Sequence, residues 1–210
     1  MTYTVKECFL TLQGEGVQAG RRAVFLRFAG CNLWSGREQD RSVAQCWFCD
    51  TDFVGTDGEG GGKFASPDAL AMRVAAVWGE GNANRLVVIT GGEPMLQLDP
   101  PLVEALHAQG FQIAVESNGT LPAVAGLDWL CISPKAGTHV IQRAGNELKL
   151  VWPQQGIDPT ELEGWDFSHF LVQPLDGPDR ERSIEAAIAL ALERPAWRLS
   201  LQAHKVVGLP

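Results

Sequence analysis

The chain of 210 residues lacks an apolar run long enough to cross a membrane, which takes about 20 consecutive apolar residues. Its first residues, 1–6, also lack the basic start and the apolar core of a secretion signal. From these two absences we expect a cytoplasmic protein with no membrane association.

Basic residues are fewer than acidic ones. The chain has 17 Lys and Arg against 25 Asp and Glu, which gives a formal net charge of −8. Proteins that bind a nucleic acid backbone neutralise its phosphates with Lys and Arg, so this balance argues against DNA or RNA as a partner. We expect small-molecule partners instead.

The chain has few cysteines, and their number, five, is odd. Disulfides are rare in cytosolic proteins, where a clustered subset of cysteines more often binds metal or takes part in chemistry. The chain has no internal repeat and no linker long enough to separate domains, and 45% of its residues are hydrophobic. We therefore expect one domain spanning residues 1–210.

Short runs of strand type alternate with helical segments along most of the chain. The expected strands are residues 23–28, 86–90, 111–116, 129–133, 147–151, 170–173 and 197–202. This alternation is typical of a mainly parallel sheet covered by helices. A closed eight-fold barrel takes about 250 residues. The sequence therefore predicts an α/β fold with six or seven strands in an incomplete, open TIM-like β/α barrel.

Four helices are expected between these strands. Three of them open with a capping side chain before a proline, which suits the first turn of a helix. These openings are Ser66-Pro67-Asp68, Asp99-Pro100 and Asp158-Pro159. Gly79 and Gly110 would end the first two helices, and residues 179–193 carry apolar side chains at helical spacing. The glycine-rich stretch 55–62 is expected to be a loop.

Three of the five cysteines form a constellation. Cys31 directly follows the first predicted barrel strand, and Cys46 and Cys49 form a C-x2-C pair. Three thiolates can hold three irons of a [4Fe–4S] cubane and leave the fourth iron open to the amino and carboxylate groups of a ligand. Cys8 and Cys131 lie in strand-like runs and are expected to be buried, inert thiols.

The cysteines alone also allow a structural zinc site, which would need a fourth ligand. His107, His139 and His169 lack zinc-finger spacing to the cysteines. A non-catalytic zinc or electron-transfer module therefore stays open as an alternative at this point.

Polar residues follow one predicted strand after another. They are Gly91-Gly92-Glu93-Pro94, Glu116-Ser117-Asn118, Ser133-Pro134-Lys135, Gln173-Pro174 and His204-Lys205. Because α/β barrels build their sites at the carboxyl ends of the strands, we expect these groups to share one site.

Six segments carry further motifs: TLQGEG at 11–16, FLRFAGCNL at 25–33, CWFCDT at 46–51, ESNGT at 116–120, ISPK at 132–135 and LQAHK at 201–205. Together with the cysteines and the Gly-Gly-Glu-Pro motif, they resemble the 7-carboxy-7-deazaguanine synthase family of the radical S-adenosylmethionine (SAM) superfamily. The motifs extend from residue 11 to residue 205, so the resemblance covers nearly the whole chain. It implies the incomplete barrel of the radical SAM type.

One feature departs from the superfamily pattern. The resemblance leads one to expect three residues between the first two cysteines, whereas fourteen separate Cys31 from Cys46, and Ser35 stands where the second cysteine would be. We expect residues at about 34–45 to form an inserted loop beside the cluster. Loop-closure entropy grows slowly with length, so such an insertion need not disrupt the site.

The resemblance implies a radical SAM carbon–nitrogen lyase. It would convert 6-carboxy-5,6,7,8-tetrahydropterin to 7-carboxy-7-deazaguanine with loss of ammonia, a step toward 7-deazapurines such as queuosine. The implied cofactors are a [4Fe–4S] cluster, SAM and Mg2+. The implied partners are the pterin, an electron donor such as flavodoxin, and a second copy of the chain in a homodimer. The alternative is another small radical SAM enzyme, such as a glycyl-radical activase, which would lack the motifs at 13–16 and 201–205.

The resemblance also implies residue roles. Cys31, Cys46 and Cys49 would hold the cluster, and Thr51 would bind Mg2+. SAM would be contacted by Trp47, Phe48, Cys49, Asp50, Gly91, Gly92, Glu93, Ser117, Ser133, Pro134, Lys135 and Gln173. The substrate would be contacted by Leu12, Gln13, Gly14, Glu15, Arg27 and Thr90. A separate expectation comes from this chain alone: Pro210 lies five residues after Lys205 at the predicted mouth of the site, so its terminal carboxylate would reach the guanidine-like edge of the substrate. Glu116 and His204 are the candidate catalytic residues.

Three of these residues have simpler interpretations when taken singly. The planar fork of Arg27 suits a carboxylate, but a structural ion pair fits a strand arginine equally well. His204 by itself fits a structural histidine, and Thr51 fits a turn cap.

Overall fold

A nine-stranded sheet runs through residues 2–209, the part of the chain described by the structure, a computed structural model. The strands are β1 (Tyr3–Leu12), β2 (Arg22–Phe28), β3 (Gly62–Phe64), β4 (Leu86–Gly91), β5 (Gln112–Ser117), β6 (Trp129–Ile132), β7 (Ala144–Trp152), β8 (Asp166–Pro174) and β9 (Trp197–Leu199). The helices are α1 (Pro67–Trp78), α2 (Pro100–Ala108), α3 (Pro159–Glu163), α4 (Arg180–Glu193) and α5 (Ala203–Val207), with 3-10 turns η1 (Glu38–Val43) and η2 (Pro94–Leu96).

The strand order is β3-β1-β2-β4-β5-β6-β7-β8-β9. All neighbours from β2 to β9 pair in parallel, whereas β1 and β3 join one edge in antiparallel fashion. Within residues 2–209 no pairing joins β9 back to β3, so the sheet curves without closing. The predicted open barrel is confirmed, and its seven parallel strands match the seven expected runs.

The antiparallel strands β1 and β3 are not among the seven expected strands, although Cys8 of β1 lies in a run of strand type. β1 is buried on both faces over most of its length, so it lacks the alternation that marks a half-exposed strand. β3 has three residues, and its first residue, Gly62, lies at the end of the stretch expected to be a loop. Short strands of this kind form because a neighbouring edge, here Tyr3–Val5 of β1, is available for pairing.

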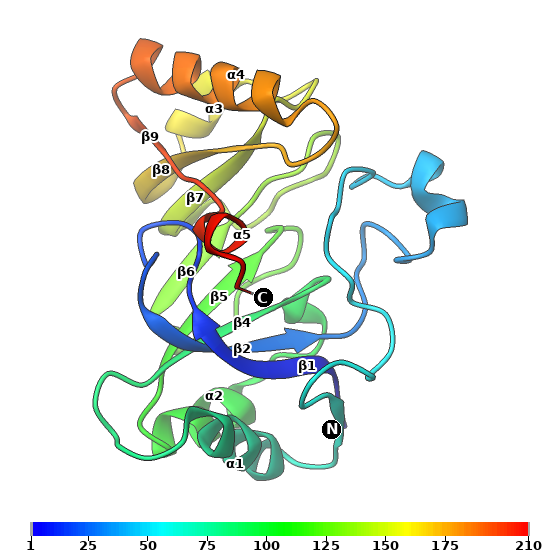
Figure 1. Cartoon of the computed structure of the whole chain (residues 1–210), viewed down its shortest axis with the longest axis vertical. Helices are drawn as coiled ribbons and strands as arrows, with labels where there is room; N and C mark the ends of the chain where they lie inside the picture. The colour runs from blue at the N-terminus through cyan, green and yellow to red at the C-terminus, as the bar shows by residue number, and fades with distance from the viewer. Residues whose placement is uncertain (1, 210) are drawn as a thin grey trace.

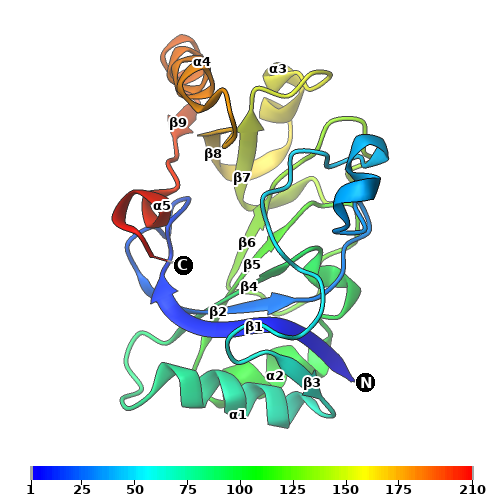
Figure 2. The ribbon, with the colours of Figure 1, turned by 45° about the vertical axis from the view of Figure 1, so that its right-hand side comes forward.

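The last predicted strand is too long. β9 ends at Leu199, and residues 203–207 turn into α5 instead of following a strand directly. The Ala203 N–H donates to the Gly14 carbonyl at 2.9 Å, and the Gly16 N–H donates to Ser200 Oγ at 3.0 Å. These bonds fasten the C-terminal segment to the loop after β1, and both views show α5 beside the end of that strand (Figures 1 and 2).

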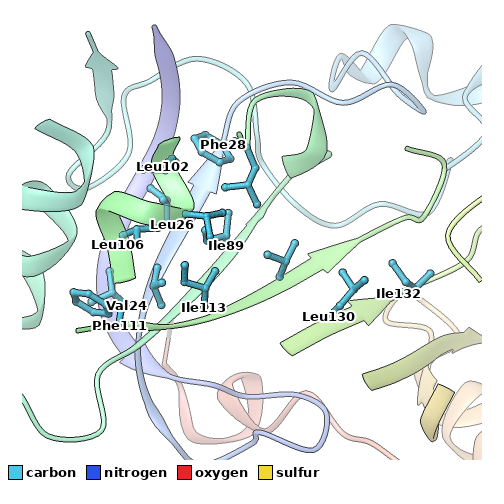
Figure 3. Close-up of a cluster of buried hydrophobic side chains, with 14 of the residues drawn as sticks. Val24, Leu26, Phe28, Ile89, Leu102, Leu106, Phe111, Ile113, Leu130 and Ile132 are labelled. Atoms are coloured by element: carbon cyan, nitrogen blue, oxygen red, sulfur yellow. The ribbon is translucent and has the colours of Figure 1, made fainter. Parts of the chain in front are cut away.

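The parallel strands bury one face against the helices. Val24, Leu26 and Phe28 of β2 pack with Ile89 of β4 and with Leu102 and Leu106 of α2 (Figure 3). α1 and α2 cover the β1–β5 end of the sheet, and α3 and α4 cover the β7–β9 end (Figure 1). Because successive side chains of a strand point to opposite faces, the alternate residues of β2 and β4 point into the barrel.

The three predicted helix caps are confirmed. Ser66, Asp99 and Asp158 each accept a hydrogen bond from a backbone N–H in the first turn of α1, α2 and α3. Cys8 and Cys131 are buried in β1 and β6, as expected. Among the helices of residues 2–209, none combines the length and apolar character needed to span a bilayer.

Asp99 is expected to contribute strongly to stability because it caps α2 and also ties that helix to β1. Its Oδ1 accepts from the Leu102 N–H at 3.1 Å and from the Tyr3 hydroxyl at 2.6 Å. Asp99→Ala should lower the free energy of unfolding by about 1–2 kcal/mol in denaturant titration. Asp99→Asn keeps an acceptor oxygen and should lose clearly less; equal losses for the two variants would contradict this role.

Candidate active site

A cavity of about 390 Å³ opens at the carboxyl ends of the parallel strands. Its lining includes every described residue of the predicted site except Trp47, Glu93 and Pro134. Pro210 lies outside the described residues, so its predicted role stays a prediction. The lining brings together polar residues that follow successive strands, among them Glu116, Ser133, Gln173 and His204.

The three cysteines of the constellation lie along one side of the cavity. Cys46 donates a hydrogen bond that lowers the pKa of Cys49 to about 6, helped by the Thr51 backbone N–H and opposed by burial. Burial raises the pKa of Cys31. The donor set of three thiols beside open space suits a cubane with one vacant iron.

A zinc site, the alternative that the cysteines left open, would need several ligands that converge on a single ion. Among residues 2–209, no three His, Cys, Asp or Glu side chains are grouped closely enough to hold one metal ion. A cubane would instead spread its three thiolate ligands over three irons.

The Gly-Gly-Glu-Pro motif places backbone, not a carboxylate, at the cavity. A Cβ on Gly92 would lie 2.2 Å from the Gly30 carbonyl oxygen, so only glycine lets this strand end pack beside Cys31. The Glu93 side chain is fully buried and accepts hydrogen bonds from Ser117 Oγ at 2.9 Å and from the Asn118 N–H at 2.8 Å. Burial raises the pKa of Glu93. Its contacts join the ends of β4 and β5.

Ser133 and Lys135 extend this cysteine side of the cavity along β6. The Ser133 N–H donates to the Ser117 carbonyl at 2.8 Å. Lys135 Nζ donates to Ser133 Oγ at 2.7 Å and to the Ser133 carbonyl at 2.8 Å. These bonds hold one hydroxyl and one ammonium at the cavity wall, where they can contact a polar ligand beside the cysteines.

Trp47 and Pro134 do not line the cavity. Trp47 is 58% exposed, and its indole packs edge-on against Phe48 at 5.5 Å between ring centroids. The Pro134 carbonyl accepts from Gln154 Nε2 at 3.4 Å. Of the aromatic pair, Phe48 is the residue that reaches the cavity.

Carboxylates and amides gather on the other side of the cavity. Gln13 Nε2 donates to Glu116 Oε1 at 2.9 Å, and Gln202 Nε2 donates to Glu15 Oε1 at 2.9 Å. Lys149 Nζ lies between the two carboxylates, 2.5 Å from Glu15 Oε2 and 3.1 Å from Glu116 Oε2. Burial raises the pKa of Glu15, but Lys149 and the hydrogen bonds from Lys149, Gln202 and Gln173 outweigh it and lower that pKa to about 2.

Sequence reasoning missed Lys149, Gln202 and Glu7 among the cavity residues. For Lys149 a signal was present, since a charged residue stands between Leu148 and Leu150 in a run expected to be a strand. An inward-pointing lysine there requires partners of opposite charge. Gln202 stands in the LQAHK motif at 201–205, but its bond to Glu15 depends on how the segment between β9 and α5 docks at the cavity.

Arg27 forms an ion pair and also lines the cavity. Its Nε donates to Glu7 Oε1 at 2.6 Å, which is the structural ion pair. Arg27 also lines the cavity next to Thr90, its register partner on β4. The ion pair uses Nε, so the remaining guanidinium N–H groups can face a bound anion.

Comparison with known proteins identifies the family of the chain. It is 62% identical to 7-carboxy-7-deazaguanine synthase of Caulobacter vibrioides and 59% identical to that of Bordetella pertussis, each over 210 residues and the full length of both chains. The chain belongs to the 7-carboxy-7-deazaguanine synthase family. The crystal structure of QueE from Escherichia coli has a TM-score of 0.70 at 28% identity and covers 97% of this chain and 95% of its own. No family model matches the chain.

The family relationship supports the open barrel of the radical SAM type and an enzymatic role. Residues 34–45, the predicted inserted loop, are held by contacts of their own. η1 forms over Glu38–Val43, and Ser35 Oγ donates to Asp40 Oδ2 at 2.6 Å. In Figures 1 and 2 this segment projects beyond the sheet.

Arg41 joins this insertion to the C-x2-C pair. Its Nη1 donates to the carbonyls of Trp47 at 2.7 Å and Cys49 at 2.9 Å, and its guanidinium lies 4.2 Å from the ring centroid of Trp34. Trp34 packs edge-on against buried Phe53 at 5.6 Å. The insertion therefore braces the backbone that carries two of the three cysteines.

Gly14 sets how closely α5 approaches the cavity. A Cβ on Gly14 would lie 2.1 Å from His204 Nδ1, so the two cannot keep their positions together. Gly14→Ala should lower the free energy of unfolding by about 1–3 kcal/mol through overpacking. It should also raise amide exchange in residues 203–207.

The matched control is Gly177→Ala, because nothing lies within 4 Å of a Cβ built on Gly177. Thermal unfolding and hydrogen exchange measured by mass spectrometry would check both variants. Unchanged exchange in α5 of Gly14→Ala would show that the His204 contact does not hold this helix.

Proposed function

We propose that this protein converts 6-carboxy-5,6,7,8-tetrahydropterin to 7-carboxy-7-deazaguanine with loss of ammonia, as a radical SAM carbon–nitrogen lyase of queuosine biosynthesis. The observation that carries the proposal is a single cavity that combines three cysteines with a network of carboxylates and an arginine. The full-length similarity to proteins named 7-carboxy-7-deazaguanine synthase supports the same reaction. It favours this reaction over that of a glycyl-radical activase.

The cysteine side of the cavity would hold the cluster and SAM. Cys31, Cys46 and Cys49 would be the cluster ligands, and the backbone of Gly91 and Gly92, which lines the same cavity, would contact the methionyl part of SAM. When bound, the cluster would supply one electron to the sulfonium of SAM for radical chemistry on the pterin. The hydroxyls of Ser117 and Ser133, with Lys135 and Gln173, would orient the SAM ribose and carboxylate; Phe48 and Asp50 would lie beside its adenine.

The carboxylate side would orient the pterin. The free N–H groups of Arg27 suit the 6-carboxylate, because a guanidinium donates two parallel hydrogen bonds to a carboxylate. The carboxylates of Glu15 and Glu116 suit the N–H donors of the pyrimidine edge. Gln13, Leu12, Gly14, Thr90 and His204 complete this wall. The substrate's reacting carbon would then lie between the two sides of the cavity.

Thr51 would contribute one ligand to Mg2+, an ion that takes few protein ligands and completes its shell with water and substrate oxygens. Thr51 lines the cavity next to the C-x2-C pair, which supports this assignment. Exposed Val43 and Trp47 near Cys46 support contact with an electron donor such as flavodoxin at this surface. The homodimer and the cytoplasmic location stay predictions.

The proposed reaction is tested by anaerobic turnover with SAM, dithionite and Mg2+, followed by mass spectrometry of the product. The reconstituted chain should hold about four irons and four sulfides and release 7-carboxy-7-deazaguanine. Cys46→Ala should lose both the cluster and the product, whereas Cys8→Ala, which removes a thiol away from the cavity, should keep both. A wild-type chain with a full cluster and no product would exclude the reaction.

Arg41 should govern how firmly the cluster is held. Hydrogen bonds from a charged donor contribute about 1.5–3 kcal/mol, so Arg41→Ala should speed the loss of iron to a chelator by about tenfold. The control is Arg37→Ala, an exposed arginine of the same insertion. Absorbance of the cluster over time would measure the loss; equal rates in the two variants would contradict the bracing role.

A further inference from the structure

Lys149 is the most enclosed charged group of the cavity. It lies on β7 with its side chain 4% exposed, and its ammonium contacts two carboxylates that come from different parts of the chain. Glu15 follows β1, and Glu116 belongs to β5. A lysine buried this deeply is rare unless its charge is compensated, and here both partners lie within 3.1 Å.

The charges around Lys149 do not balance. Two carboxylates share one ammonium, and Glu147 and the Cys131 thiol are the other titratable groups that act on it. Glu147 accepts from the Val17 N–H at 3.0 Å and lies near Cys131 Sγ at 3.5 Å. Glu15 also accepts from the neutral amides of Gln202 and Gln173. The cavity wall at Glu15 and Glu116 therefore keeps one uncompensated negative charge.

Both carboxylates of the pair still have acceptor capacity. Glu116 accepts from Lys149 on one oxygen and from Gln13 on the other, whereas Glu15 accepts from Lys149, Gln202 and Gln173. A carboxylate oxygen can accept two hydrogen bonds, so Glu116 keeps one lone pair on each oxygen and Glu15 keeps one in all. The contacts from Lys149, Gln202 and Gln13 fix where those lone pairs can point.

We propose that Lys149 is a positioning residue that keeps Glu15 and Glu116 both ionised and aims their free lone pairs at the adjacent N–H groups of a 2-amino-4-oxopyrimidine ring. This inference rests on the proposed function, because the pterin supplies that ring. A protonated carboxyl turns one of its two oxygens into a donor, which would face an N–H unfavourably, so the ionised form accepts best from this edge.

The physical reason is that two carboxylates so close together do not both stay ionised without a cation between them. Like charges in a shared site raise the pKa of one carboxyl strongly. Lys149 opposes this, and its own pKa is raised by Glu116 and Glu15 although burial acts in the opposite direction. At neutral pH Lys149 therefore keeps its positive charge, and Glu15 and Glu116 can accept hydrogen bonds from a ligand.

Lys149→Gln tests the proposal because it keeps a hydrogen-bond donor and removes the charge. Without the cation the pKa of the carboxylate pair rises, so at pH 6.5 the holoenzyme should bind the pterin about tenfold or more weakly, as expected for loss of a charged hydrogen bond. Raising the pH ionises the pair again, so affinity should recover toward wild type by pH 9. Anaerobic calorimetric titration with carboxytetrahydropterin measures both values.

The pH dependence separates positioning from a purely structural role. A damaged cavity would bind weakly at every pH, so a pH-independent loss or an unchanged dissociation constant would overturn the proposal. Lys149→Arg keeps the positive charge, so its affinity for the pterin should rise no more than that of the wild type between pH 6.5 and pH 9. Such a rise in this variant would also overturn it.

Two controls keep the outcomes distinct. Lys63→Gln removes an exposed lysine of β3 and should match wild type at each pH. If Lys149→Gln does not fold, the double variant Glu15→Gln/Lys149→Gln is used, because it removes one charge of each sign. The affinity of this double variant for the pterin should change little with pH. A strong recovery of its affinity at pH 9 would contradict the proposed electrostatic coupling of Lys149 to the two carboxylates. A wild type that fails to turn over the pterin would instead reject the proposed function.

Discussion

The parallel register of the central strands is the constraint on which the rest of the structure depends. Because β2, β4 and β5 pair in the same direction, their carboxyl ends meet at one edge of the sheet. Residues that alternate with the buried Val24, Leu26 and Ile89 point inward, and these include Arg27 and Thr90 at matching positions. Helix packing on one face and cavity chemistry on the other are thus two consequences of one pattern.

The cavity has a cysteine side and a carboxylate side, and α5 connects them. Lys205 of this short helix donates to Asp50, beside the C-x2-C pair, and to Asp176, after β8, both at 2.6 Å. His204 of the same helix packs on Gly14, and Gln202 just before it bonds Glu15. The end of the chain therefore contacts both sides, although it forms no strand there.

Much of this arrangement could be predicted from local pattern. Three features depend only on neighbours in the sequence and can therefore be recognised from it: capping residues such as Ser66 and Asp99, the periodicity of the strands, and the polar residues after each strand. The roles of Glu93 and Trp47 could not be read in this way. Both lie within motifs that point to the cavity, yet Glu93 turns into the core to join β4 and β5, and Trp47 lies at the surface.

By itself the sequence determined the open α/β barrel, the three-cysteine constellation and the edge of the sheet at which the site forms, because each follows from residue type and spacing along the chain. The tertiary structure alone decided which charges meet. Lys149 lies 134 residues from Glu15 and 33 from Glu116. Only the curvature of the sheet brings these three side chains within hydrogen-bonding distance. The interaction between two charges depends on their distance in space, and the spacing of strands along the sequence does not reveal that distance.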